Sequence, residues 1–165
     1  MGLKHRWSFE SVADRLSQSE KSEIRISTSG KRNIALIFLA PYGVGMSNLG
    51  FQTVHRILGT HPGIGVERFF LPLSERVPHP PPYYSFESRR PLGDFDILAF
   101  SLSFEGDFDM LPLLLGPMGI PILRSRRRAP MPLLLAGGAA IGSNPAALSE
   151  VFDILVPGEA ETCLP

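Results

Sequence analysis

The residues best placed to bind a ligand lie in four short segments, each directly after an apolar run. The first is the turn of residues 42–48, which follows the run 34–40, and the others are 103–107, 137–144 and 158–159; Ser101, near the end of the preceding strand, joins the second of them. Glycine in such turns lets backbone amides approach a ligand closely, and serine and asparagine add hydrogen-bonding groups. The candidate binding residues are Tyr42, Gly43, Val44, Gly45, Met46, Ser47, Asn48, Ser101, Ser103, Glu105, Gly137, Gly138, Asn144 and Gly158.

These segments contain no set of side chains typical of catalysis. Glu105 and Glu159 both follow predicted strands, but no nucleophile or histidine stands beside them, so we interpret them as loop contacts. The four histidines are scattered, without metal-ligand spacing, and we expect each at the surface. The glycines at 43, 45 and 50 do not fit the dinucleotide-binding fingerprint, and no P-loop motif occurs. We therefore expect a binding chain that is not catalytic by itself.

The charge balance and apolar runs narrow the class of partner. Sixteen basic and sixteen acidic residues cancel, so no global field favours nucleic acid or an anionic membrane. Every apolar run is shorter than the roughly 18 residues of a membrane span, and no signal peptide is visible. A single cysteine, Cys163, fits a reducing compartment. We expect a cytoplasmic protein without nucleic-acid or membrane partners.

Strands and helices alternate along the chain in the order that builds a parallel sheet. Apolar runs bounded by turn residues predict strands buried on both faces, and right-handed crossovers place helices on each side of the sheet. The expected fold is an α/β, flavodoxin-like (Rossmann-like) three-layer sandwich with a five-stranded parallel sheet in the order 2-1-3-4-5. This order gathers the candidate loops at one edge. The predicted strands are 34–40, 66–71, 96–102, 132–136 and 153–156, and the predicted helices are 48–58, 109–116 and 145–151.

Cap residues and prolines set the expected limits of these elements. Ser47 is the expected N-cap of the first helix. Asp109 is the expected N-cap of the second, because it places Pro112 in the first turn, and Ser143 or Asn144 is the expected N-cap of the third, ahead of Pro145. The proline-dense stretch 72–94 cannot hold a regular helix, so we expect an irregular surface excursion there.

Three further stretches have alternative interpretations. We divide the chain into an N-terminal extension, residues 1–32, and an α/β domain, residues 33–165. In the extension, the spacing of Trp7, Phe9, Val12 and Leu16 predicts a short amphipathic helix, and residues 17–32 are predicted to be a solvated linker. Tyr83, Tyr84 and Phe86 are expected to pack beneath the proline-rich stretch, with a docking surface as the alternative. The basic run 124–128 is interpreted as a solvated loop, with an RNA or acidic-partner contact as the alternative.

Five blocks within residues 33–161 resemble the N-terminal cobalamin-binding-type domain of radical S-adenosylmethionine (radical SAM) proteins. They read PYGVGMSNLGFQTVHRIL, ERFFLP, SFESRRPLGDFDILAFSLSFEGDF, GIPILRSR and PLLLAGGAAIGSNPAALSEVFDILVPGEAE. In that family the flavodoxin-like domain precedes a barrel that binds S-adenosylmethionine and an iron–sulfur cluster through a CxxxCxxC motif, which is not present here. The resemblance implies that the chain is the N-terminal part of a longer protein, and that its partner is the C-terminal radical barrel of the same polypeptide.

The cobalamin-binding pattern of that family is matched unevenly. The DxHxxG turn is replaced by PYGVGMSNLG, which lacks the histidine that binds cobalt from below. In the Ser-x-Leu element Ser101 is kept and Ser103 takes the place of leucine, and the Gly-Gly element matches Gly137 and Gly138. The resemblance implies cobalamin held without a lower histidine, with its nucleotide tail between the Ser101 and Gly137 loops and the corrin over residues 42–48.

Two other hypotheses remain at this stage. One is a cofactor-free scaffold that docks or gates the barrel, and bulky side chains of Tyr42, Met46 or Phe104 filling the cleft would favour it. The other is an α/β module that binds a small anion at the helix starting near Ser47, where free amides favour negative charge.

Overall fold

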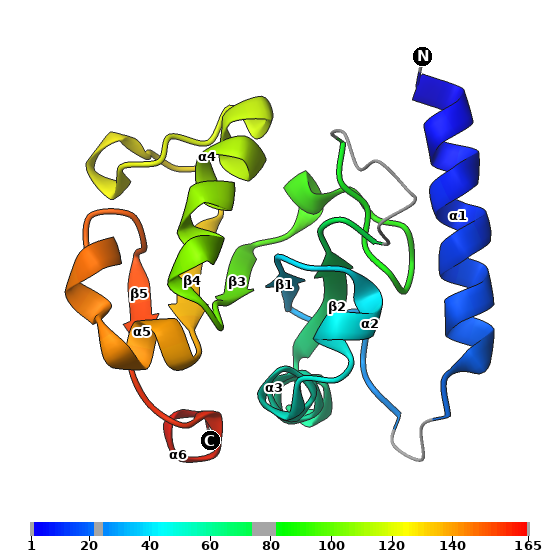
Figure 1. The fold of residues 1–165 in the computed structure, drawn as a ribbon, viewed down its shortest axis with the longest axis horizontal. Helices are drawn as coiled ribbons and strands as arrows, with labels where there is room; N and C mark the ends of the chain where they lie inside the picture. Colours follow the sequence, from blue (N-terminus) through cyan, green and yellow to red (C-terminus); the bar gives the residue numbers. More distant parts are fainter. Residues whose placement is uncertain (1, 22–24, 74–81, 165) are drawn as a thin grey trace.

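The computed structural model describes residues 2–21, 25–73 and 82–164 as an α/β sandwich built on one sheet (Figure 1). All neighbouring strands are parallel, and their order is β2-β1-β3-β4-β5. This confirms the predicted class and strand order. The strands are β1 (Arg32–Phe38), β2 (Ile64–Phe70), β3 (Ile97–Ser101), β4 (Leu133–Gly137) and β5 (Ile154–Val156).

The strands begin and end at slightly different residues from those predicted, because pairing as well as hydrophobicity decides their limits. β1 starts two residues before the apolar run, since Arg32 pairs with Ile64 and Asn33 with Gly65. The backbone N–H of Asn33 also donates to the Asp96 carboxylate over 2.8 Å. Polar residues are thus included in the ladder wherever a neighbouring strand supplies partners.

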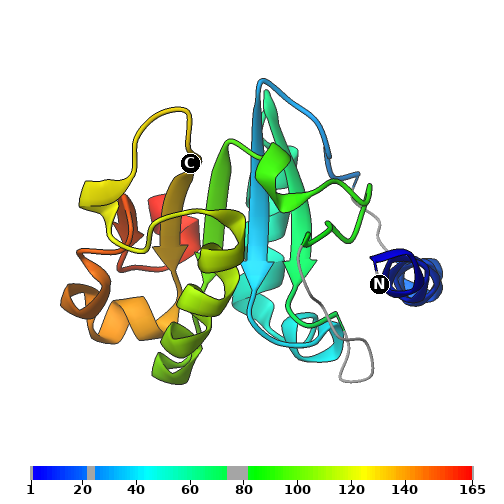
Figure 2. The same ribbon diagram turned by 90° about the horizontal axis from the view of Figure 1, so that it is seen from above.

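Helices cover both faces of the sheet, as Figure 2 shows. α3 (Leu49–Thr60) and the single turn α6 (Ala160–Cys163) lie on one face, and α4 (Met110–Leu115) and α5 (Ala139–Ser143) on the other. Successive side chains of a strand point to opposite faces of the sheet, so each strand contributes apolar side chains to the core on both faces. Leu36 and Ala99 belong to the core beneath α3, whereas Ile37 and Leu98 belong to the core beneath α4. The remaining short helices are α2 (Tyr42–Gly45), η1 (Leu92–Asp94), η2 (Glu105–Asp109), η3 (Gly116–Met118), η4 (Arg124–Arg126) and η5 (Pro145–Leu148).

Two predicted helix caps are wrong. Asn48, and not Ser47, caps α3: its side-chain oxygen accepts the N–H of Phe51 over 2.9 Å, while the Ser47 hydroxyl donates to the carbonyl of Val44. Asp109 makes no side-chain cap bond and already has helical backbone angles, because η2 runs directly into α4. Pro112 nevertheless falls in the first turn of α4, as its missing N–H requires.

The region after β4 also differs from the prediction. The expected helix 145–151 is reduced to the 3-10 turn Pro145–Leu148, although Asn144 does precede it. The helix α5 lies earlier, at Ala139–Ser143, and starts at once after Gly138. Its small residues carry little periodic signal, so the sequence did not reveal it.

The N-terminal helix α1 (Gly2–Ser19) is present and lies beyond the β2 edge of the sheet, next to residues 82–90, in both views. Phe9 and Ala13 are buried against the core beneath α3. Of the predicted solvated linker 17–32, residues 17–19 belong to α1, and most of residues 25–32 are exposed, as predicted. This segment is nevertheless tied to the domain, because the N–H of Ser27 donates to the carbonyl of Gly59 and its carbonyl accepts the N–H of Val66. A chain packed by backbone contacts leaves no side-chain pattern to recognise.

The described part of the proline-rich region, residues 72–73 and 82–94, holds no α-helix, as predicted, but it is not a surface excursion. Residues 74–81, with Pro78, Pro80 and Pro81, lie outside the described residues. Tyr83, Phe86 and Leu92 are buried, which confirms the packing expected of the aromatic cluster and shows that this segment belongs to the core.

The basic run 124–128 is not uniformly solvated, because Arg127 is buried. Its guanidinium donates to the carbonyls of Pro121, Ile122 and Val151 and to the Asp153 carboxylate. Arg127 therefore holds the irregular segment before β4 against residues 151–153, which lead into β5, while Arg124, Arg126 and Arg128 remain exposed.

Candidate functional site

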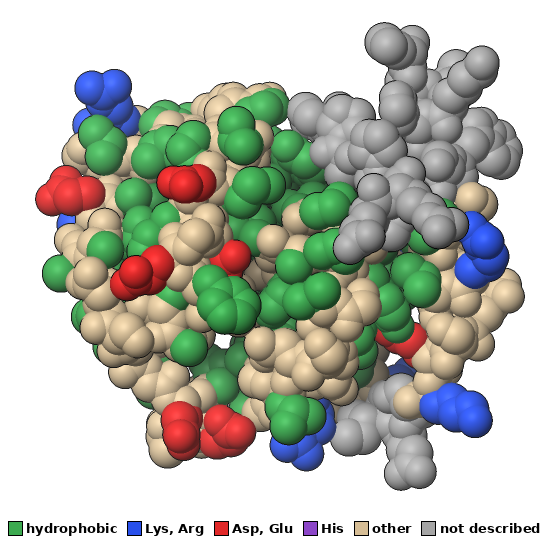
Figure 3. Space-filling model, in the orientation of Figure 1, with side chains coloured by type: hydrophobic (Ala, Val, Ile, Leu, Met, Phe, Trp, Pro, Cys, Tyr) green, Lys and Arg blue, Asp and Glu red, His purple; other side chains and the backbone are tan. Residues whose placement is uncertain are grey.

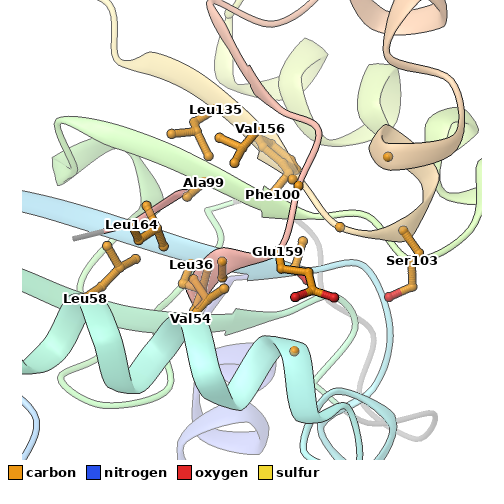
Figure 4. A pocket seen from close by; sticks show the side chains of 18 of the residues that line it. Leu36, Val54, Leu58, Ala99, Phe100, Ser103, Leu135, Val156, Glu159 and Leu164 are labelled. Atoms are coloured by element: carbon orange, nitrogen blue, oxygen red, sulfur yellow. The ribbon is translucent and has the colours of Figure 1, made fainter. Parts of the chain in front are cut away.

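A cleft of about 680 Å³ lies between α3 and α6, over the α3 face of the sheet. Figure 3 shows the molecule hollowed between α3 and the side that carries α5 and α6. The cleft begins at the carboxyl ends of β3, β4 and β5 and follows the strands inward (Figure 4). Its apolar floor and walls are formed by Ile34, Leu36, Val54, Leu58, Ile97, Ala99, Leu135, Val156 and Leu164.

Small residues keep the cleft open where the sheet would otherwise be covered. Ala99 of β3 lies on its floor, and Gly137, which ends β4, pairs in register with Ser101. Gly142 in α5 also lines the cleft, and a Cβ added there would meet no atom within 4 Å. Space for a ligand is therefore a consequence of side-chain size at these positions.

The second glycine of the Gly-Gly pair is also required by the backbone. Gly138 has φ of 110°, and a Cβ there would lie 2.5 Å from the carbonyl oxygen of Leu102. A residue with a side chain would be strained in this conformation and would push β4 away from the loop after β3. Gly138 is thus needed for the close approach of the two loops that border the cleft.

A polar rim lies at the mouth of the cleft. The side-chain amide of Asn48 donates to the hydroxyl of Ser103 over 3.2 Å, which joins the loops after β1 and β3. Figure 4 shows Glu159 projecting into the cleft between α3 and Ser103. The site therefore combines an apolar interior with hydroxyl, amide and carboxylate groups at its entrance, which is the usual composition of a small-molecule pocket.

The structure brings together some of the predicted site residues and separates others. Asn48, Ser101, Ser103, Gly137, Gly138 and Gly158 line the cleft. Tyr42 and Met46 instead line a second pocket of about 680 Å³, next to Arg68 and Glu87. Those that line neither pocket are Gly43, Val44, Gly45, Ser47, Glu105 and Asn144.

Helix α2 is the reason for this division. Directly after β1 the backbone turns into a short helix, Tyr42–Gly45, whose Tyr42 side chain packs against Phe70 and Phe86 on the β2 side of the fold. Only Asn48, at the start of α3, returns to the mouth of the cleft. The sequence also did not reveal Val54, Leu58 and Leu164 as cleft residues, although the helical spacing of Val54 and Leu58 was a usable signal.

The second pocket contains the most strongly perturbed ionisable groups. His55 is largely buried, which, together with the charge of Arg68, lowers its pKa to about 4. Burial raises the pKa of Tyr42, and the adjacent Glu20 carboxylate raises it further. Burial also raises the pKa of Glu87, while the hydrogen bonds from Arg68 oppose that shift. The prediction that all four histidines lie at the surface is therefore wrong for His55.

Residues 50–165 match the family of radical SAM proteins, N-terminal. The match covers well over half of the chain and includes β2 to β5 and three of the four predicted binding loops. The chain belongs to this family. No curated protein and no solved structure matches the chain.

Within this radical SAM N-terminal region, two kinds of feature are not found. Among residues 2–21, 25–73 and 82–164, no group of three or more His, Cys, Asp or Glu is arranged to hold a metal ion. In the same part of the chain, no helix is long and apolar enough to cross a membrane.

Proposed function

We propose that this chain is the cobalamin-binding domain of a radical SAM enzyme, and that it holds the cofactor without a lower histidine ligand. The observation that supports this most is the cleft at the carboxyl edge, where the Ser101, Ser103 and Gly137 loops meet over an apolar floor. These loops are the ones in which the sequence keeps most of the cobalamin-binding pattern. The radical barrel, with its iron–sulfur cluster and S-adenosylmethionine, is proposed to lie in the C-terminal part of the same polypeptide.

The chemistry of the cleft suits the two ends of such a cofactor. Leu36, Ala99 and Leu135 offer an apolar slot for the flat base of the nucleotide tail. Ser103, Asn48 and Glu159 offer acceptors and donors for the amide groups around the corrin, and Ser101 and Gly137 flank the path between them. When bound, cobalamin supplies a cobalt centre that carries methyl groups or electrons.

The chain would hold the cofactor by its tail and corrin edge and not through cobalt. The segment 42–48 contains no histidine, and none of the described histidines lines the cleft. His55 faces the second pocket instead. The role of this domain is thus to bind and orient the cofactor and to exclude water from its tail.

The cleft lacks the side chains that would favour a cofactor-free scaffold. Tyr42 and Met46 turn away into the second pocket, and the Phe104 side chain is 70% exposed. Neither arrangement fills the cleft, so this observation supports the cofactor over the scaffold.

Exposed apolar side chains at the same edge favour a second role, docking of the radical barrel. Leu49 is 78% exposed and Val44 50%, and together with Phe104 they stand on the loops after β1 and β3. Figure 3 shows hydrophobic side chains gathered across the middle of this face. Apolar groups concentrated around a cleft are typical of an interaction surface. We propose that the barrel closes the cleft from this side.

Reconstitution tests the cofactor proposal. The chain is mixed with hydroxocobalamin, separated by gel filtration and examined by its visible spectrum. We expect the corrin absorption to co-elute with the protein in a one-to-one ratio. A colourless protein fraction, from the chain alone and from the full-length polypeptide alike, would contradict the proposal.

A further inference from the structure

Arg68 of β2 is a buried cation whose guanidinium binds two carboxylates, one on each of two of its edges. Its Nε donates to Glu87 over 2.6 Å, and its two terminal nitrogens donate to Glu20, each over 2.8 Å. Arg68 is only 5% exposed, and its guanidinium lies 4.8 Å from the centre of the Phe86 ring. Its position is therefore fixed by groups of the α/β domain, whatever occupies the Glu20 edge.

The two carboxylates come from different parts of the chain. Glu87 lies between β2 and β3 and also accepts the backbone N–H of Arg68 over 2.7 Å. Glu20 follows the C-terminus of α1 and reaches Arg68 from outside the sheet, with 24% of its side chain exposed. Glu87 is thus a permanent partner of Arg68, whereas Glu20 occupies a site that opens towards the second pocket.

The site around Glu20 has the geometry of a carboxylate receptor. One carboxylate oxygen accepts from a terminal nitrogen of Arg68 and from the hydroxyl of Tyr42 over 2.7 Å, and the other oxygen accepts from the second terminal nitrogen. A planar fork of two parallel N–H groups plus one hydroxyl matches the two oxygens of a carboxylate and no monatomic anion. These donors hold the pKa of Glu20 below its ordinary value, although burial by itself raises it.

The adjoining pocket has room and unused polar capacity for a second group. Its volume is about 680 Å³, and it is lined by Arg56, Lys21 and His55 in addition to the receptor. The His55 Nε2 atom is buried and has no hydrogen-bond partner among the described residues, since the nearest Glu87 oxygen is 3.9 Å away. Without Glu20 the described side chains of this pocket carry more positive than negative charge.

We propose that Arg68 and Tyr42 form a second binding site, for a small carboxylate, which the chain's own Glu20 occupies in the free protein. A ligand carboxylate takes the place of Glu20 on the Arg68 fork, and the rest of the ligand lies in the pocket towards His55 and Arg56. Displacement of Glu20 also removes one of the bonds that hold α1 to the domain. The site is independent of the cobalamin proposal, because none of its residues lines the cleft between α3 and α6.

The test compares acetate with chloride in three forms of the chain. Glu20→Ala empties the receptor, and Glu20→Gln is the matched control because it keeps the receptor filled without a charge. The third form combines Glu20→Ala with Arg68→Lys, which keeps the positive charge but removes the planar fork. Thermal unfolding is measured in sodium acetate and in sodium chloride at equal ionic strength, so that screening is the same in both salts.

We expect the Glu20→Ala variant to melt roughly 5 to 10 °C below the wild type in chloride, because Arg68 loses a buried partner. Acetate should recover most of this loss, and saturation transfer from the protein to the acetate methyl group should be seen by NMR. For the wild type, for Glu20→Gln and for the double variant, the melting temperature in acetate should equal that of the same form in chloride. If Glu20→Ala is unfolded in chloride, the return of its native circular dichroism in acetate is the expected result.

Two results would overturn the proposal. One is a Glu20→Ala variant that behaves identically in acetate and in chloride. The other is an acetate effect of equal size in Glu20→Gln or in the double variant, since that effect would not depend on the vacated fork. Neither result bears on hydroxocobalamin binding, so failure of this site and failure of the proposed function are distinguishable.

Discussion

The side chain of Asn48 donates a hydrogen bond to the hydroxyl of Ser103 over 3.2 Å and so joins two loops at the mouth of the cleft. The same side chain accepts the N–H of Phe51 through its oxygen and caps α3. One residue therefore fixes both the start of the helix that walls the cleft and the distance between its two bordering loops.

The two roles of Asn48 can be separated by substitution. Asn48→Asp keeps the cap oxygen but loses the amide donor, whereas Asn48→Ala loses both. We expect Asn48→Ala to lower the free energy of unfolding by about 1 kcal/mol, as for other lost N-caps, and Asn48→Asp to change it little. Urea unfolding measures both values. Equal destabilisation by the two substitutions would show that the Ser103 bond, and not the cap, carries the effect.

Filling the cleft tests whether it is the cobalamin site. Gly142→Leu places a side chain in the cleft, where a Cβ meets no atom within 4 Å, so the fold should be retained. Gly116→Leu is the matched control, because Gly116 has equally open space and does not line the cleft. We expect the first variant to lose most of its bound hydroxocobalamin after gel filtration and the second to keep it. Equal retention by both would place the cofactor elsewhere.

The largely buried His55 should make the stability of the chain depend on pH. Its pKa in the folded chain is about 4, below the ordinary value of 6.5, so between these values the unfolded chain binds more protons than the folded one. Stability is therefore lost as the pH falls from 6.5 to 4, by about 3 kcal/mol in all, and the contribution is constant above and below this window. His55→Gln should remove this part of the pH dependence, while the titrations of Glu20 and Glu87 remain. Parallel curves of unfolding free energy against pH would contradict the prediction.

Arg127 should contribute far more to stability than its neighbours in the basic run. Arg127→Ala leaves three carbonyls and Asp153 without their buried donor, so we expect a loss of about 3 to 5 kcal/mol. Arg126→Ala removes an exposed side chain and should change stability by less than about 0.5 kcal/mol. Chemical unfolding of both variants measures the difference. Similar values for the two would mean that the run is solvated throughout.

The docking proposal predicts protection of the carboxyl edge in the full-length polypeptide. Backbone amides of residues 42–49 and 103–109 should exchange hydrogen more slowly there than in this chain. Phe104→Glu should return their exchange to the faster rate and leave that of β1 unchanged. Hydrogen exchange followed by mass spectrometry measures both. Identical exchange in the chain and the full-length polypeptide would contradict barrel docking at this face.

The sequence predicted the elements whose signal is local. The branched apolar runs that became β1, β3 and β4 are bounded by breakers, so their strands and parallel order could be inferred. The prediction was wrong where the outcome depends on a distant partner. Ser47 and Asn48 are both good caps, and only the path of α2 decided between them.

The candidate site shows the same division between local and distant information. Glycine and serine after the strands were sufficient to place Ser101, Ser103, Gly137 and Gly138 at one edge, because parallel strands end together. Whether a loop residue faces the cleft depends instead on how the backbone turns after the strand. Residues 42–46 turn into α2 and away from the cleft. Arg68 and Glu20 are 48 positions apart, and no sequence motif predicted that they would meet in the second pocket.

By itself, the sequence determined the fold class, the strand order and the four loops that compete to form a site, since hydrophobic run length and turn residues are properties of short segments. The tertiary structure alone decided which loops form the cleft, that Arg127 is buried and His55 largely buried, and that Arg68 holds a carboxylate from beyond α1. Burial and charge pairing depend on distances across the fold, and such distances are fixed only when the layers have packed.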